Sequence, residues 1–286
     1  MAVATQTFAD RLAAEVERKH SQLVVGLDPQ PDLMPVELRG DVARFCCGLV
    51  DAVAPHAAAV KPQLAFFEAL GPAGMAAFDD VCLYARRAGL LVIADGKRGD
   101  IGSTARAYSE AYLEGDLPRA DALTVNPYLG RESVEPYLAA ARRGGRGVFV
   151  IVKTSNAGSD VQDLVLKDGR PLWHHIASLV AEWGEDLVGD VGLSSVGAVV
   201  GATHPRAVAE ARRLMPQAIL LLPGIGAQGG EVADLQRAFQ SGPASAVVNA
   251  SRSVNYAYRE TGGDYREAAG AEAARLKQEI WAASGW

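Results

Sequence analysis

Short apolar runs alternate with longer amphipathic segments from one end of the chain to the other. Most of these runs are continuously apolar and rich in β-branched residues, which is typical of parallel strands covered on both faces. They predict strands at Leu23–Leu27, Ala57–Val60, Leu90–Ala94, Ala122–Val125, Val148–Val152, Val196–Val200, Ala218–Leu222 and Ala246–Val248. The amphipathic segments predict helices at Phe8–His20, Ala43–Ala54, Phe78–Ala88, Thr104–Glu114, Val134–Arg143, Leu172–Asp186, Arg206–Leu214, Gly230–Gln240 and Asp264–Ala283.

Eight successive strand-then-helix units, joined without a linker or a change in composition, predict one closed barrel. The predicted fold class is α/β: a single (β/α)₈ TIM-barrel domain over residues 1–286, with an N-terminal and a C-terminal helix added. A length of 286 residues is near the usual size of that fold. A doubly wound open sheet is the alternative. The longest irregular stretch, Thr154–Arg170, follows the fifth predicted strand and is a candidate mobile active-site loop.

Composition restricts the partners of such a barrel. A chain that is 49% hydrophobic can bury a large core, and its net charge of −6 argues against nucleic-acid binding. No apolar run reaches the ~18 residues of a membrane helix, and Met1–Asp10 does not resemble a signal peptide. Cys46, Cys47 and Cys82 lack metal-ligand spacing and are interpreted as reduced thiols. We therefore expect a cytoplasmic protein with no membrane partner.

Polar side chains follow most of the apolar runs, at the points where the predicted strands end. In a TIM barrel these ends meet on one face, and that face carries the active site. The residues at these ends are Asp28, Lys61, Asp95, Lys97, Asp100, Asn126, Lys153, Thr154, Ser155, Ser251 and Arg252. The pattern predicts a charged site at the mouth of the barrel, where a few placed cations would hold an anionic substrate.

The densest stretch runs from Ile93 to Thr104, directly after the third predicted strand. On an extended chain Asp95 and Lys97 face the same way, because they are two residues apart. Gly96 and Gly99 are expected to let the backbone turn sharply there. An isolated Asp-x-Lys is usually a solvated surface pair, and an incidental salt-bridge network is the alternative here. Lys61 at the neighbouring strand end favours a functional charge cluster instead.

The combination of motifs closely resembles the orotidine 5′-monophosphate decarboxylase family, in its longer-chain, type 2 branch. The resemblance spans Leu23 to Val254 and no single motif carries it alone. Its parts are Asp95-x-Lys97-x-x-Asp100-Ile101-x-x-Thr104, Val60-Lys61-Pro62, Gly26-Leu27-Asp28, Leu123–Tyr128, Val152–Asn156 and the glycine-rich loop Pro223–Gly230. The family implies conversion of orotidine 5′-monophosphate to UMP and CO₂ without a cofactor or metal, the last step of de novo pyrimidine nucleotide synthesis.

Decarboxylation leaves negative charge at C6 of the pyrimidine ring, and an ammonium group can both stabilise that charge and protonate it. By resemblance, Lys97 is this proton donor. Asp95 would lie near the substrate carboxylate and disfavour the ground state. Lys61 and Asp100 would complete a Lys61-Asp95-Lys97-Asp100 array. The family also implies a homodimer in which Asp100 and Thr104 reach into the partner's active site.

The resemblance assigns the remaining contacts to parts of the substrate. Asp28 and Lys61 would bind the ribose hydroxyls and Ser155 the pyrimidine, with Ile101 and Asn126 also in the binding site. Phosphate contacts are predicted for Pro223, Gly224, Gln228, Gly229 and Arg252. Gly224-x-Gly226-x-x-Gly229 fits a dinucleotide fingerprint formally, but Asn249 stands where that motif needs an acidic residue. Ser251 occupies the position before Arg252 where many relatives have glycine.

Three other functions fit parts of the pattern. A Mg²⁺-dependent decarboxylase of keto-sugar phosphates shares the Asp-x-Lys-x-x-Asp run but needs a carboxylate near the end of strand two, where Lys61 stands. A Schiff-base aldolase needs an uncharged lysine, whereas Lys97 lies between two aspartates. A non-catalytic nucleotide-binding barrel would keep the phosphate loop without needing all four charges. Lys153 is a possible further cation at the mouth.

Overall fold

The computed structural model describes residues 6–115, 119–224 and 232–286. Its eight parallel strands pair in chain order, and β8 pairs with β1 through Leu23 and Val248, so the barrel is closed. The strands are β1 Leu23–Leu27, β2 Ala59–Pro62, β3 Leu91–Arg98, β4 Ala122–Val125, β5 Gly147–Lys153, β6 Ser194–Val200, β7 Ala218–Pro223 and β8 Ala246–Ala250. The predicted (β/α)₈ fold is confirmed, and an open sheet is excluded.

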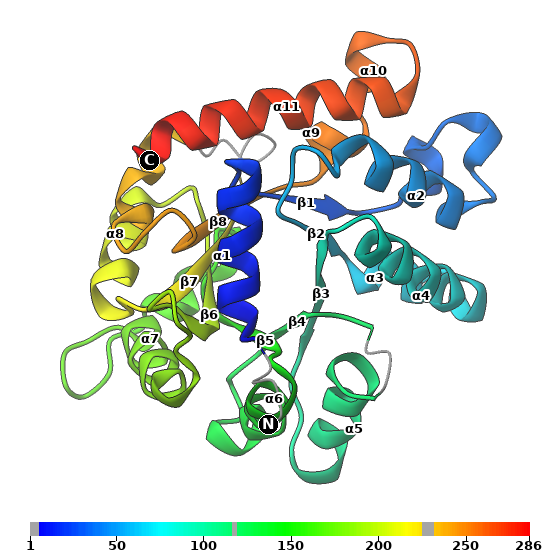
Figure 1. Cartoon of the computed structure of the whole chain (residues 1–286). Helices are drawn as coiled ribbons and strands as arrows, with labels where there is room; N and C mark the ends of the chain where they lie inside the picture. The colour runs from blue at the N-terminus through cyan, green and yellow to red at the C-terminus, as the bar shows by residue number, and fades with distance from the viewer. Residues whose placement is uncertain (1–5, 116–118, 225–231) are drawn as a thin grey trace, which may run out of the picture.

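Helices surround the barrel and cover the outer faces of the strands (Figure 1). The α-helices are α1 Phe8–Lys19, α2 Val42–Val53, α3 Leu64–Glu68, α4 Gly71–Arg87, α5 Gly102–Leu113, α6 Arg131–Gly144, α7 Leu172–Trp183, α8 Pro205–Leu214, α9 Arg252–Asn255, α10 Tyr258–Thr261 and α11 Tyr265–Ser284. The 3₁₀ segments are η1 Pro31–Leu33, η2 Val36–Leu38, η3 Ala157–Asp163, η4 Glu185–Leu187 and η5 Val232–Phe239. Within these described ranges no helix is long and apolar enough to cross a membrane.

Three helical predictions need correction. The sequence pattern missed the short helix α3, and α4 begins at Gly71 rather than Phe78 because Pro72 is tolerated in a first turn. The helix predicted over Leu172–Asp186 ends at Trp183, where Ser194 donates a hydrogen bond to the carbonyl of Gly184. The described part of the helix predicted over Gly230–Gln240 is the 3₁₀ segment η5.

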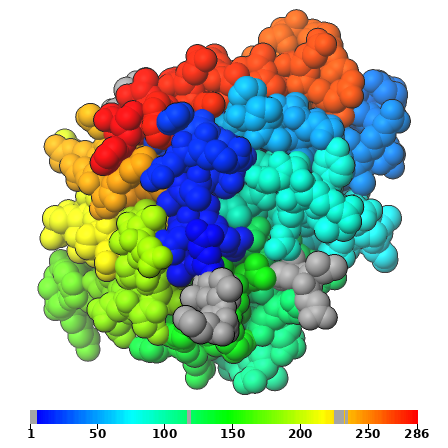
Figure 2. Space-filling view, in the orientation of Figure 1, coloured from blue at the N-terminus to red at the C-terminus, as the bar shows by residue number. Residues whose placement is uncertain are grey.

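Helix α1 closes the N-terminal end of the barrel. It lies across the centre of the view in Figure 1, and Figure 2 shows it packed among the surrounding helices. Phe8 and the aliphatic residues of α1 form one apolar cluster with inward-facing strand residues such as Phe149. The rings of Phe8 and Phe149 pack edge-on, with 5.8 Å between their centroids. Gly147 allows this approach, because a Cβ there would lie 2.4 Å from the Phe8 ring. The inner core of the barrel therefore depends on α1.

Replacing Phe8 with alanine is expected to lower the free energy of unfolding by about 3–5 kcal/mol, because it removes a fully buried ring from this inner core. Chemical denaturation of the two proteins measures the difference. The control is Leu83→Ala on α4, where the side chain is 39% exposed and the change should stay within about 0.5 kcal/mol. Equal losses in the two variants would contradict the role assigned to α1.

Candidate active site

A cavity of about 330 Å³ opens at the C-terminal ends of the strands. Its walls come from residues at or just after β1 to β8, as expected for the functional face of a TIM barrel. The sequence-predicted residues that line it are Asp28, Lys61, Asp95, Lys97, Thr154, Ser155, Pro223, Gly224, Ser251 and Arg252. The fold thus brings together side chains separated by more than 200 positions in the chain.

Asp95 forms the centre of a buried charge network in this cavity. Its Oδ2 atom lies 2.7 Å from Nζ of Lys61, and its Oδ1 atom lies 2.6 Å from Nζ of Lys97. Gln63 Nε2 donates to Oδ2 at 3.1 Å, and Thr124 Oγ1 donates to Oδ1 at 2.9 Å. Lys61 and Asp95 are buried, whereas the Lys97 side chain is 45% exposed. Lys97 is therefore the member of the network most accessible to a ligand.

The network keeps its buried groups ionised. Burial alone would raise the pKa of Asp95, but Lys61 and Lys97 outweigh it and hold that pKa well below its usual range. Burial likewise works to lower the pKa of Lys61, and the charges of Asp95 and Asp28 more than offset it, so this pKa is raised. An ammonium and a carboxylate are thus both available at the base of the cavity.

The backbone at Lys97 departs from the expected geometry. Asp95 and Lys97 meet as predicted, but Lys97 has a φ of 45°, in the left-handed region that costs a residue with a side chain about 1–3 kcal/mol. Gly96 and Gly99 are not at positive φ, so the left-handed residue of this turn is Lys97 itself. They allow close packing instead: a Cβ on Gly96 would lie 2.6 Å from Leu64, and one on Gly99 would lie 3.1 Å from the carbonyl oxygen of Asn126.

Asp28 is held at the cavity by contacts with the segment after β8. Its backbone N–H donates to Oδ1 of Asn255 at 3.1 Å, and its carbonyl accepts from the Tyr256 hydroxyl at 2.7 Å. Its carboxylate atom Oδ1 is buried and accepts no hydrogen bond from the described residues. Burial raises the pKa of Asp28, and the nearby charge of Lys61 limits the rise. The carboxylate is therefore an acceptor that a ligand hydroxyl could use.

The opposite wall is formed by the ends of β7 and β8. Gly224 has a φ of 109°, which a side chain would disfavour, and Arg252 begins α9 with an exposed side chain. Within the described ranges no ion pair joins Arg252 to a carboxylate. Gln228 and Gly229, which the sequence assigns to phosphate binding, lie outside the described residues. The described part of this wall offers one cation and backbone groups, which suits an anion.

Four predicted site residues do not line the cavity of their own chain: Asp100, Ile101, Thr104 and Asn126. Asp100 Oδ1 accepts from the N–H of Ile101, whose side chain is 49% exposed, and Thr104 is exposed at the start of α5. Asn126 is exposed, and its Oδ1 accepts from the N–H of Tyr128 at 3.0 Å. Within one chain the charge network therefore has three of the four predicted members.

Sequence reasoning missed several polar residues that line the cavity, among them Gln63, Thr124 and Asn249. Gln63 lies two residues after Lys61, the spacing that points side chains the same way, and this signal could have identified it. Asn249 stands within an apolar strand, where asparagine is unexpected, whereas Thr124 is of a type that is common in strands. A polar residue close to the C-terminal end of a barrel strand was thus the usable signal.

Lys153 serves the loop after β5 rather than the cavity. Its buried ammonium lies 2.7 Å from Oδ2 of Asp163 and donates to the carbonyl of Ser159 at 3.2 Å. Both partners belong to η3, within the irregular stretch Thr154–Arg170. Lys153 therefore anchors this segment to the end of β5.

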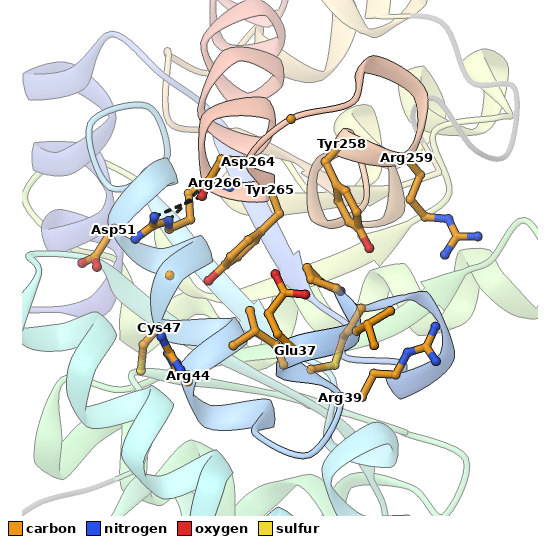
Figure 3. Close-up of a pocket in the computed structure, with 16 residues that line it drawn as sticks. Glu37, Arg39, Arg44, Cys47, Asp51, Tyr258, Arg259, Asp264, Tyr265 and Arg266 are labelled. Atoms are coloured by element: carbon orange, nitrogen blue, oxygen red, sulfur yellow. Dashed lines mark hydrogen bonds and ion pairs between the residues drawn. The ribbon is translucent and has the colours of Figure 1, made fainter.

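A larger cavity, of about 740 Å³, lies between η2, α2 and the start of α11 (Figure 3). Arg266 pairs with Asp264 there, and Glu37 and Arg44 are exposed. A charged site suited to catalysis places its charges out of bulk water, where their interactions are stronger. The smaller cavity at the strand ends meets that condition through Lys61 and Asp95, and it is the candidate active site.

Buried opposite charges on the C-terminal face place this chain among the TIM-barrel enzymes, the class in which that face carries the catalytic groups. Comparison with known proteins narrows the class. Residues 21–263 match the model of the family described as "Orotidine 5'-phosphate decarboxylase / HUMPS family". The chain therefore belongs to this family, as its motifs indicated.

Relatives and a solved structure agree with this assignment. The orotidine 5′-phosphate decarboxylase of Deinococcus radiodurans is 48% identical over 93% of this chain and 95% of that protein. The protein of the same name from Rhodopirellula baltica is 46% identical over 88% of this chain and 89% of its own length. The structure of Leishmania donovani OMP decarboxylase has a TM-score of 0.78 and 33% identity, covering 98% of this chain and 100% of that one. The similarity thus covers at least 88% of this chain and at least 89% of each of these proteins.

The charge network predicts how stability changes with pH in a Lys61→Met variant. The folded-state pKa of Asp95 is depressed, so its ionised carboxylate stabilises the fold at pH values above the usual carboxyl pKa of about 4. This stabilisation is progressively lost as the pH falls below about 4. We expect the free energy of unfolding of the variant to be about 2 kcal/mol lower than that of the wild type at pH 7. This difference between the two proteins should become smaller towards pH 3. Urea unfolding across this range measures it. Lys167→Met, in an exposed loop, is the control, and a gap that stays constant would contradict the prediction.

Proposed function

We propose that this chain catalyses the decarboxylation of orotidine 5′-monophosphate to UMP and CO₂ without a cofactor, completing de novo pyrimidine nucleotide synthesis. The single observation that carries the proposal is the buried Asp95 carboxylate, paired with both Lys61 and Lys97 at the mouth of the barrel. Membership of the family and the names of its 46–48% identical relatives support the same reaction.

In the proposed step the bond between C6 and the carboxylate carbon breaks, CO₂ leaves, and the electron pair stays on C6. The Lys97 ammonium stabilises this pair and transfers a proton to it, after which solvent reprotonates the lysine. The 45% exposure of the Lys97 side chain makes it the accessible acid of the network. Asp95 would lie near the substrate carboxylate and disfavour the ground state, while Lys61 keeps Asp95 ionised.

Substrate recognition would divide between the two walls of the cavity. The unpartnered carboxylate oxygen of Asp28, with Lys61, suits the ribose hydroxyls. Ser155, on the segment after β5, would read the pyrimidine ring. Arg252, with the backbone at Pro223 and Gly224, would bind the phosphate, and we assign Gln228 and Gly229 to the same role.

We propose further that the active site is completed by a second copy of the chain. Asp100 and Thr104, with Ile101 between them, do not line their own cavity, and Ile101 and Thr104 are exposed. In a homodimer Asp100 would supply the fourth charge of the array to the partner's site. Asn126 follows β4 near these residues and is assigned to the same shared region. The three free cysteines are compatible with the reducing cytoplasm, where we place the protein.

An activity assay would distinguish two other functions from this one. The metal-dependent decarboxylase of keto-sugar phosphates would need a carboxylate where Lys61 stands, and Lys61 is buried against Asp95. A nucleotide-binding barrel without activity would bind UMP but leave orotidine 5′-monophosphate unchanged. The buried charge network favours catalysis, because ligand binding alone does not require it.

The purified protein is expected to consume orotidine 5′-monophosphate in the presence of EDTA, measured by the loss of substrate absorbance. Lys97→Ala should reduce kcat by at least about 10²–10³-fold, because it removes both an electrostatic donor and the proton source. Lys167→Ala, an exposed lysine in the loop after β5, should retain wild-type activity. UMP binding without turnover by the folded wild type would favour the binding protein, and activity that appears only with Mg²⁺ would favour the metal-dependent enzyme.

Complementation tests the shared active site. Lys97→Ala and Asp100→Ala should each be inactive alone, but a refolded 1:1 mixture should recover about a quarter of the wild-type activity. Half of randomly assorted dimers would be hybrids, and each hybrid would contain one site with both Lys97 and the partner's Asp100. Analytical ultracentrifugation of each variant confirms that dimers form. A mixture as inactive as its components would exclude sharing of Asp100 between subunits.

A further inference from the structure

Thr124 is a buried polar residue in an apolar strand, and the roles proposed above do not use it. It is 1% exposed and stands between Leu123 and Val125 in β4, where valine would have nearly the same shape. Its side chain lines the cavity beside Asp95 and Lys97. The hydroxyl is therefore not needed to fill the barrel, and its hydrogen bonds show what it contributes.

The strand pairing explains one of these bonds. Ala94 pairs with Leu123 and Arg98 with Val125, so three residues of β3 lie opposite the single residue Thr124. Lys97 lies within this bulge, so its N–H has no partner residue in the β3–β4 register. The Thr124 hydroxyl oxygen accepts from that N–H at 2.9 Å. Thr124 thus supplies a side-chain acceptor for the N–H of Lys97, the residue whose φ is 45°.

The second bond joins the same hydroxyl to the charge network. Because the Lys97 N–H must donate, the hydroxyl proton is free to point to Oδ1 of Asp95, at 2.9 Å. That oxygen also lies 2.6 Å from Nζ of Lys97. A closed ring of contacts results, in which the backbone and the ammonium of Lys97 are both held through Thr124 and Asp95.

We propose that Thr124 is a positioning residue, whose hydroxyl fixes the left-handed backbone of Lys97 and the orientation of Asp95 so that the ammonium is held where the proton is delivered. This inference rests on the proposed function. A lysine side chain has four rotatable bonds, so two anchor points restrict it far more than one. Thr124 does not need to touch the substrate to affect the reaction.

Kinetics of Thr124→Val and Thr124→Ser test the proposal. Valine keeps the shape and removes the hydroxyl, so we expect kcat to fall about 10–100-fold while KM changes little, because misplacing a catalytic group by about 1 Å has effects of that order. Serine keeps the hydroxyl and should restore most of kcat. Ser195→Ala, which removes a buried hydroxyl bonded to the N–H of Ala9 at the α1 end, should leave kcat unchanged. Wild-type kcat in the valine variant would overturn the proposal.

Hydrogen exchange at the Lys97 amide, measured by NMR, tests the same contact without relying on activity. The amide should be protected in the wild type and in Thr124→Ser, and should exchange at least about 10-fold faster in Thr124→Val because its acceptor is gone. Thr124→Ala repeats the test if the valine variant does not fold. Unchanged exchange would overturn the proposal. If the wild type does not decarboxylate its substrate, the proposed function fails, and the exchange result still decides whether Thr124 anchors Lys97.

Discussion

The rest of the candidate site depends on the Asp95 carboxylate, which is buried and receives four donors. Lys61 and Gln63 bind one oxygen, and Lys97 and Thr124 bind the other. A carboxylate removed from water is costly unless its lone pairs are satisfied and its charge is balanced. Both conditions are met only if β2, β3 and β4 end at the same level. The closed barrel provides this, because parallel strands in sequential order place their C-terminal ends side by side. The charge network and the fold therefore specify each other.

The geometry of this carboxylate also explains the irregular end of β3. A regular strand would direct Lys97 to the same side as Asp95 but would turn its N–H towards β2, because odd-numbered residues of β3 such as Leu91 bond to that side. The bulge turns this N–H towards β4 instead, where the Thr124 hydroxyl accepts a hydrogen bond from it. Gly96 packs against Leu64 of α3, so the bulge is supported from the β2 side as well. Local backbone strain at Lys97 is thus maintained by contacts from two neighbouring strand–helix units, as is common where a side chain must be placed accurately.

The sequence predicted the barrel and most of the residues that line its mouth, because continuous apolar strands and polar residues at their ends are local patterns. Asp28, Lys61, Asp95, Lys97 and Arg252 all follow that pattern and line one cavity. The left-handed backbone was not predictable, since the glycines beside Lys97 were the more natural place for it and tertiary packing reversed that preference. Thr124 was missed because threonine is also an ordinary strand residue, and its function depends on a register that no local pattern encodes.

The two ends of the barrel have opposite effects on stability. At the mouth, a buried ion pair and a strained lysine contribute little or cost about 1–3 kcal/mol. Such costs are significant against a total stability of about 5–15 kcal/mol. At the other end, α1 buries Phe8, Leu12 and Val16 against inward-facing strand residues, and each fully buried side chain stabilises the fold by about 1.5–3 kcal/mol. The inner core formed with α1 can therefore offset the strain at the mouth.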